Sequence, residues 1–189
     1  MNTIKVCCLI FTGALLSACG SEGYTVTPVV VTAQSGSKVE LTGSWRSACH
    51  SSSSDYIVNV RVYTVNGRVS ESTEKYAAAD SSCNTLISTD RSATDLHVTV
   101  GADKTVLGWR DGAGSPASAP TDQSGSVLSG TPMVTKYSWL LTSGAISRSI
   151  SLIDDSVTDN WVMYVADSTE LDADGYPDYL ATANPLFKQ

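Results

Sequence analysis

The sequence has few charged residues and very little histidine, and these shortages exclude several classes of protein. Charged residues make up 16% of the 189-residue chain, with 12 Lys and Arg against 19 Asp and Glu, for a net charge of −7. Strong nucleic-acid binding needs clustered Lys and Arg that contact phosphates, so we expect no nucleic-acid partner. A hydrophobic content of 42% is sufficient to form a core, which argues against a globally disordered chain.

Signatures of catalysis are also lacking. The chain has no Gly-x-Ser-x-Gly elbow, which would place a nucleophilic serine on a sharp turn. His50 beside Ser51–Ser54 is the nearest approach to a Ser/His pair, but such a pair needs a base within reach and oxyanion donors. We interpret this stretch as a serine-rich loop. The sequence therefore predicts a protein that is not an enzyme and needs no cofactor.

The N-terminus has the three-part plan of a secretory signal. Lys5 supplies the positive charge, residues 6–16 form a short apolar run, and the small residues Ser17 and Ala18 follow. The apolar run is too short to span a bilayer. A buried N-terminal strand or helix is the alternative, but the pattern favours a signal peptide over residues 1–18.

Leu16-Ser17-Ala18-Cys19 resembles the lipobox of bacterial lipoproteins. In that family the cysteine thiol takes a diacylglyceryl group and a peptidase cuts the chain before it. The resemblance implies a mature chain anchored to a membrane through Cys19. Gly20, rather than Asp, follows the cysteine, which by resemblance to enterobacterial sorting favours the outer membrane. Residues 19–37 are predicted to form a tether, with at most a short edge strand at residues 29–32, because Pro28 disfavours a central strand.

Removing the leader and the lipidated cysteine leaves Cys49 and Cys83 from the five cysteines of the chain. An even pair in an exported protein predicts a disulfide, because the compartment is oxidising. A redox or metal pair is the alternative. The chain has no Cys-x-x-Cys motif, and only His50 and His97 could assist a metal, so we favour the disulfide.

From residue 38 onward, short β-prone stretches alternate with turn signals. Residues 57–63 alternate in polarity, and Asn66-Gly67 follows shortly after them. Asn-Gly between two alternating stretches is the strongest short signal for a β-hairpin. Counting such stretches gives eight to ten strands and no long amphipathic helix. The sequence therefore predicts one all-β domain over residues 38–189, an antiparallel barrel or sandwich. Residues 111–126 are a low-complexity loop, which we interpret as a tolerated insertion more readily than as a binding loop.

Gly43-Ser44-Trp45 resembles the Gly-x-Trp signature on the first strand of lipocalin-like barrels, where the tryptophan closes the barrel floor. Small bacterial lipoproteins with a lipocalin-like fold often show this motif, a cysteine shortly after it, a hairpin and a second cysteine. They also often end in an Asp-Gly-x-Pro turn, as at residues 174–177. The resemblance implies a lipocalin-like antiparallel barrel with Gly43 and Trp45 at its floor.

Three further tryptophans, Trp109, Trp139 and Trp161, are candidates to line a ligand pocket. Each lies among apolar neighbours in a predicted strand, so packing in the core is the simpler interpretation. Trp109 directly precedes the flexible loop and is the best candidate for a pocket rim.

The C-terminal segment holds Asp172, Asp174 and Asp178 around Gly175, a pattern similar to acidic calcium loops. The bidentate glutamate of such loops is missing, and turn chemistry alone explains the Asp, Gly and Pro residues. Calcium therefore remains a weak candidate, and we predict no metal site.

These observations predict a lipid-anchored lipoprotein of the cell envelope that is not an enzyme. The first hypothesis is that its barrel binds a small apolar or amphipathic ligand. The second is that the barrel is filled and acts as a structural or protein-interaction module.

Overall fold

The computed structural model describes residues 27–189, and this part of the chain is all β-structure without helices. No helix there is long and apolar enough to cross a membrane. The predicted signal peptide and Cys19 lie outside the described residues. The strands are β1 (Val30–Thr32), β2 (Lys38–Glu40), β3 (Gly43–Ser47), β4 (His50–Ser52), β5 (Asp55–Tyr63), β6 (Arg68–Tyr76), β7 (Leu86–Thr105), β8 (Gly108–Arg110), β9 (Pro116–Ala117), β10 (Met133–Leu140), β11 (Ile146–Asp154), β12 (Val162–Leu171), β13 (Pro177–Ala181) and β14 (Leu186–Lys188).

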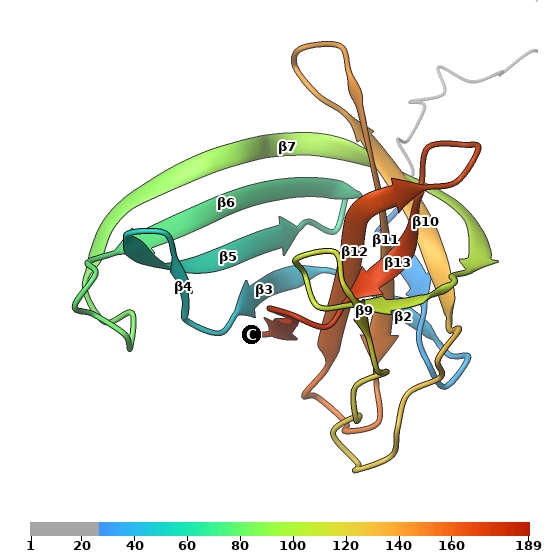
Figure 1. The fold of residues 1–189 in the computed structure, drawn as a ribbon. Helices are drawn as coiled ribbons and strands as arrows, with labels where there is room; N and C mark the ends of the chain where they lie inside the picture. The colour runs from blue at the N-terminus through green and yellow to red at the C-terminus, as the bar shows by residue number, and fades with distance from the viewer. Residues whose placement is uncertain (1–26) are drawn as a thin grey trace, which may run out of the picture.

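Eight of these strands close into an antiparallel barrel (Figure 1). Their order is β11-β10-β7-β6-β5-β3-β14-β12, and β12 returns to pair with β11. The closure confirms the predicted fold class, an antiparallel barrel, and is compatible with a lipocalin-like architecture. The predicted hairpin is also present, because β5 and β6 pair on either side of Asn66-Gly67.

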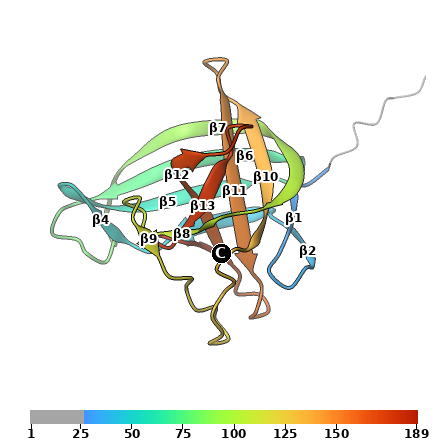
Figure 2. The ribbon, with the colours of Figure 1, turned by 45° about the vertical axis from the view of Figure 1, so that its right-hand side comes forward.

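The strands of the barrel wall differ in length. The longest of these strands, β7, has 20 residues and pairs with two neighbouring strands. Its first part pairs with β6 up to His97, and its second part pairs with β10 from Val98 onward. Register shifts interrupt both pairings, and such bulges bend a strand and increase its twist. Strands β5, β6 and the first part of β7 therefore extend away from β10–β12 as a curved wall (Figures 1 and 2).

A short N-terminal hairpin, β1–β2, completes one side of the interior. Val29, Val31, Val39 and Leu41 are all buried in the same apolar cluster as residues of the barrel. The backbone N–H of Gln34 also donates to the carbonyl of Ile153 on β11. Residues 27–37, which the sequence assigned to the tether, thus belong to the fold, because alternate apolar side chains of this hairpin supply part of the core.

Trp45 lies at the centre of that main cluster and is fully buried. Its indole Nε1–H donates to the Leu41 carbonyl at 2.8 Å, which joins β3 to the N-terminal hairpin. Gly43, two residues earlier, has φ of +122°, a backbone conformation that favours glycine. The pair predicted for the barrel floor therefore lies where the hairpin closes over the interior.

A second apolar cluster lies on the outer face of β10–β12. Strands β13, β8 and β9 continue the sheet from the far end of β12 and fold back over this face. Val134, Ile150 and Leu180 are fully buried in this cluster. The two clusters make β10–β12 a wall that is covered on both sides.

Cys49 and Cys83 form a disulfide, as the sequence predicts, with their Cα atoms 5.8 Å apart. Cys49 lies between β3 and β4, and Cys83 lies in the connection between β6 and β7. The bridge therefore ties the outer end of the curved wall to the start of the barrel.

Candidate functional site

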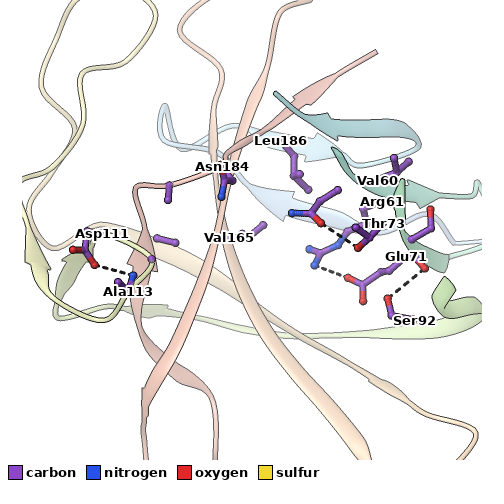
Figure 3. Close-up of a pocket in the computed structure, with 15 residues that line it drawn as sticks. Val60, Arg61, Glu71, Thr73, Ser92, Asp111, Ala113, Val165, Asn184 and Leu186 are labelled. Atoms are coloured by element: carbon purple, nitrogen blue, oxygen red, sulfur yellow. Dashed lines mark hydrogen bonds and ion pairs between the residues drawn. The ribbon is translucent and has the colours of Figure 1, made fainter. Parts of the chain in front are cut away.

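A cavity of about 580 Å³ opens between the curved wall and β12. One side is formed by β5 and β6, and the other by β12, by the ends of β13 and β14 and by two loops at residues 111–113 and 183–184 (Figure 3). The cavity falls within the size range of sites for small ligands. Part of the loop predicted as an inert insertion thus lines it.

Arg61 and Glu71 form the polar base of this cavity. They are direct partners in the β5–β6 register, and Arg61 Nη2 lies 2.5 Å from Glu71 Oε1. The guanidinium also donates to the Tyr137 hydroxyl at 2.9 Å. Because β10 and β5 are not neighbours in the sheet, this bond crosses the interior of the barrel. Arg61 therefore points inward.

The environment of Arg61 keeps it a cation. Burial alone would lower the pKa of its guanidinium, but the neighbouring Tyr63 and Tyr137 hydroxyls and the Glu71 carboxylate raise that pKa well above its usual value. A buried charge is retained only where it is paired and hydrogen-bonded. The cavity therefore has a fixed dipole at its base, with its positive end at Arg61.

A second polar pair continues the same face outward. Asn59 and Thr73 are partners in the β5–β6 register, and the Thr73 hydroxyl donates to the Asn59 side-chain carbonyl at 3.2 Å. Successive residues on one face of a strand are two positions apart, so Asn59 follows Arg61 and Thr73 follows Glu71. Together Asn59, Arg61, Glu71 and Thr73 form a polar strip along one wall.

The opposite wall carries aliphatic side chains together with the polar residues Asn184 and Asp111. Val165 and Leu186 project toward the polar strip (Figure 3), and the small side chains Ala181 and Ala183 line the same side. The cavity therefore has a polar strip on one side and, on the other, an aliphatic patch bordered by polar residues.

The first loop places one further charge at the cavity. Asp111 accepts hydrogen bonds from the backbone N–H groups of Ala113 and Ser115 at 2.8 and 3.0 Å. These bonds lower the pKa of the Asp111 carboxyl, because they stabilise the anion. These hydrogen bonds also fix the shape of the loop. The mouth of the cavity is therefore formed by an ordered turn.

Trp139, predicted to line a pocket, lies behind Arg61. Its ring stacks on Tyr137 at a centroid distance of 5.8 Å, and Arg61 Cζ lies 5.7 Å from the Trp139 ring centroid. The side chain is only 4% exposed. Within residues 27–189, its indole N–H and the buried Ser151 hydroxyl have no hydrogen-bond partner. Trp139 therefore packs against Tyr137 and Arg61 on the side away from the cavity.

The other two tryptophans lie elsewhere. Trp109 is buried in the second cluster, edge-on to Tyr164 and with its indole N–H donating to the Ser129 carbonyl at 2.9 Å. It lies outside the barrel because β8 pairs with β13, beyond the ring of eight strands. Trp161 is partly buried beside the main cluster, with Lys188 Nζ 4.1 Å from its ring centroid. Neither tryptophan lines the cavity at Arg61.

A lysine side chain forms ion pairs with the acidic residues of the C-terminal turn. Lys104 Nζ lies 2.6 Å from Asp172 Oδ2 and 2.7 Å from Asp178 Oδ1. The third acidic residue, Asp174, faces Lys136 at 3.7 Å. The ammonium group of Lys104 thus takes the place between the carboxylates that a calcium ion would need. Among residues 27–189, no group of three or more His, Cys, Asp or Glu side chains is placed to hold a metal ion.

Arg61 and Glu71 were not singled out from the sequence, although a signal for them exists. Alternation places Asn59, Arg61 and Tyr63 on one face of a strand, but it does not say which face points inward. Once a hairpin is centred on Asn66, positions 61 and 71 become partners, and they carry opposite charges. Such a pair on the face that also carries a buried tyrosine indicates an inward-facing ion pair.

Comparisons with known protein families, with curated proteins and with solved structures find no match to this chain. The likeness to lipocalin-like proteins therefore rests on the motif at residues 43–45 and on the eight-stranded barrel. Function must be argued from the site, since one fold supports many functions.

Proposed function

We propose that this protein is a lipid-anchored, non-enzymatic protein of the bacterial cell envelope that binds a small amphipathic ligand in its barrel. The observation that carries the proposal is the cavity of about 580 Å³ at Arg61 and Glu71. Its polar strip and aliphatic patch face each other, and few convergent polar groups in a concave site are typical of small-molecule binding.

The charges of the lining favour a neutral polar group on the ligand. Arg61 contributes +1, and Glu71 and Asp111 contribute −1 each, which gives the lining a formal charge of −1. Since Arg61 is already paired with Glu71, the described residues that line the cavity offer no free cation to attract a carboxylate. A wholly apolar ligand would remove water from the charged pair without replacing its hydrogen bonds, which is costly. Hydroxyl or amide groups next to a short aliphatic segment suit both walls.

Calorimetric titration of residues 20–189, the mature chain without its lipidated Cys19, tests this ligand class. Two ligands with alkyl tails of similar length are compared below their critical micelle concentrations: octyl glucoside, with a neutral hydroxyl-rich head, and octanoate, with a carboxylate. We expect octyl glucoside to bind at least about tenfold more tightly, a difference of ~1.4 kcal/mol. Equal binding, or tighter binding of octanoate, would refute the proposed ligand class.

Anchoring through Cys19 is supported by the lipobox resemblance at residues 16–19 and by the signal-like leader before it. Several acyl chains give firm anchoring, because each buried methylene contributes about 0.8 kcal/mol. The Gly20 position favours the outer membrane. Radioactive palmitate should label the natural chain and should not label a Cys19→Ala variant, and labelling of both would count against the anchor.

A filled barrel that docks a protein partner is the second candidate. The observation that favours it is the tightly occupied half of the interior, where Trp45, Tyr63 and Tyr137 are fully buried. Crosslinking in intact envelopes followed by purification should then recover one specific protein. If nothing specific is recovered, this second function loses its support.

A further inference from the structure

The hairpin between β10 and β11 projects from the barrel with aliphatic side chains at its end. Leu140 and Ile146 are the last paired residues of the two strands, and they are 61% and 52% exposed. Leu141, next to them, packs against the main cluster. Leu141 belongs to the turn beyond Leu140, so this side chain holds the turn to the core while Leu140 and Ile146 are open to solvent. Figures 1 and 2 both show this hairpin extending beyond the other strands.

The hairpin and its neighbours carry no formal charge over three separate segments. Residues 137–147 contain no Lys, Arg, Asp or Glu, and the same holds for residues 62–67 and 96–102. The segments meet in the fold, because Val98 pairs with Trp139 and its N–H donates to the Gly67 carbonyl at 2.8 Å. The end of this hairpin thus carries no charged side chain of its own, and the acidic turn at Asp174 lies beside its base at Lys136.

The N-terminal end of the described chain lies in this same region. The Thr27 carbonyl oxygen lies 2.6 Å from the position that a Cβ would take on Gly67. Only residues 20–26 separate Thr27 from Cys19. Eight residue steps span at most about 28 Å when fully extended. A lipid on Cys19 would therefore hold this side of the barrel close to the bilayer.

We propose that the hairpin end, Leu140–Ile146, inserts its aliphatic side chains into the headgroup region of the bilayer that holds Cys19. The inference rests on the proposed lipid anchor. The acyl chains supply the affinity, and the hairpin supplies a second contact that fixes the orientation of the barrel. An uncharged end carrying two large aliphatic residues can enter the interface without burying a charge.

Another exposed aliphatic residue provides a matched comparison. Leu171 is 56% exposed, similar to Leu140 and Ile146. It is followed directly by the acidic turn that contains Asp172 and Asp174. Charged neighbours make that site unsuitable for the headgroup region, so Leu171 serves as the control position.

Fluorescence quenching in vesicles tests the contact with the full lipidated chain. The Thr142→Cys variant carries a nitrobenzoxadiazole dye at the hairpin end, and the Thr158→Cys variant carries it in the turn at the opposite end of β11. Labelling is specific, because Cys49 and Cys83 are joined in a disulfide. The chain is reconstituted into phosphatidylethanolamine–phosphatidylglycerol vesicles that contain spin-labelled lipid. We expect at least about threefold stronger quenching at position 142 than at position 158.

Aspartate substitutions identify the side chains responsible. Adding Leu140→Asp and Ile146→Asp to the Thr142→Cys chain should abolish the quenching, whereas adding Leu171→Asp should leave it unchanged. All variants should still float with the vesicles, since the acyl chains remain. Circular dichroism checks that each variant is folded.

Each remaining outcome overturns the inference in a distinguishable way. Flotation with equal, weak quenching at both positions would leave the lipid anchor standing and remove the hairpin contact. A blue shift at position 142 without lipid quenching would mean that a second copy or another protein covers the hairpin. A chain that does not float would overturn the anchor and the contact together.

Discussion

Arg61 and Glu71 form an ion pair inside the barrel, with Arg61 Nη2 2.5 Å from Glu71 Oε1 across the β5–β6 register. Their side chains are 15% and 20% exposed, so both are largely shielded from water. Paired charges at such a depth contribute little to net stability, because desolvation offsets their attraction. Their position at the base of the cavity is the feature on which the proposed ligand site depends.

Removing one member of the pair should destabilise the protein. A Glu71→Gln variant keeps the shape of the side chain but leaves the Arg61 charge without its partner. We expect the free energy of unfolding to fall by about 3 kcal/mol, as for other broken buried pairs. Urea unfolding measures this loss. Asp95→Asn is the matched control, because Asp95 pairs with Arg68 at the surface, where such pairs contribute ~1 kcal/mol or less. Equal losses in the two variants would contradict the buried position of Glu71.

Trp45 should be the most sensitive position of the main cluster. Its side chain is fully buried, and its indole N–H donates a hydrogen bond to the Leu41 carbonyl. Replacement of a buried tryptophan by alanine costs about 3–5 kcal/mol, so Trp45→Ala should lower the urea midpoint by the corresponding amount. Trp161→Ala, at a partly buried site, should cost clearly less. A Trp45→Ala loss no larger than the Trp161→Ala loss would contradict the central position of Trp45.

Reduction of the disulfide should weaken the fold without changing the cavity. Cys49 and Cys83 are separated by 34 residues in sequence, and the chain-entropy account gives about 3–4 kcal/mol for a loop of that length. Unfolding in urea with and without dithiothreitol measures the difference. A chain with both cysteines replaced by serine should show no response to the reductant. If the natural chain is equally stable in both conditions, the bridge does not constrain its unfolded state.

Lys104 and its two aspartates predict a dependence of stability on acid pH. Partial burial works to raise the pKa of Asp172, but the Lys104 ammonium and the backbone N–H groups of Tyr176 and Asp174 lower it by more. A carboxyl whose pKa is lowered by folding stabilises the protein above its unfolded pKa, about 3.9. That contribution disappears as the pH falls through the lower folded value.

A Lys104→Met variant isolates this effect. It should be less stable than the natural chain at pH 7, and the gap between the two free energies of unfolding should narrow below about pH 4, the ordinary range of an aspartate. Urea unfolding between pH 2 and pH 7 measures the gap. A constant gap over this range would contradict the role of the Lys104–Asp172 pair.

The barrel could be predicted from sequence because its signals are local. Alternation at residues 57–63 and the Asn66-Gly67 turn define the first hairpin, and regularly spaced turns define the remaining strands. The closure of β12 onto β11 was not predictable in detail, because strand pairing leaves no mark on periodicity. The N-terminal hairpin was missed for a different reason. Val29 and Val31 read as a short edge strand, and nothing local shows that Val39 and Leu41 bury the same face.

The cavity was harder to predict because it is formed by distant segments. The sequence predicted tryptophans as pocket residues, but Trp109 and Trp139 are buried in the core. Large apolar rings gain more free energy from burial than from lining a polar site. Apart from Leu186 and two valines, the residues that line the cavity are small, polar or charged. Asp111 and Ala183 lie in turns whose positions depend on β8 and β13 being folded back along β12.

The most direct test of the binding account is to fill the cavity. Thr73→Trp places an indole on the polar strip, whereas Val62→Trp places the same group on the opposite face of β5, whose side chain at position 62 is exposed. Octyl glucoside binding is measured by calorimetry for both variants and for the natural sequence, each over residues 20–189. We predict that Thr73→Trp abolishes binding and that Val62→Trp retains the natural affinity. Binding that survives in Thr73→Trp, with the fold intact by circular dichroism, would show that the cavity at Arg61 and Glu71 is not the ligand site.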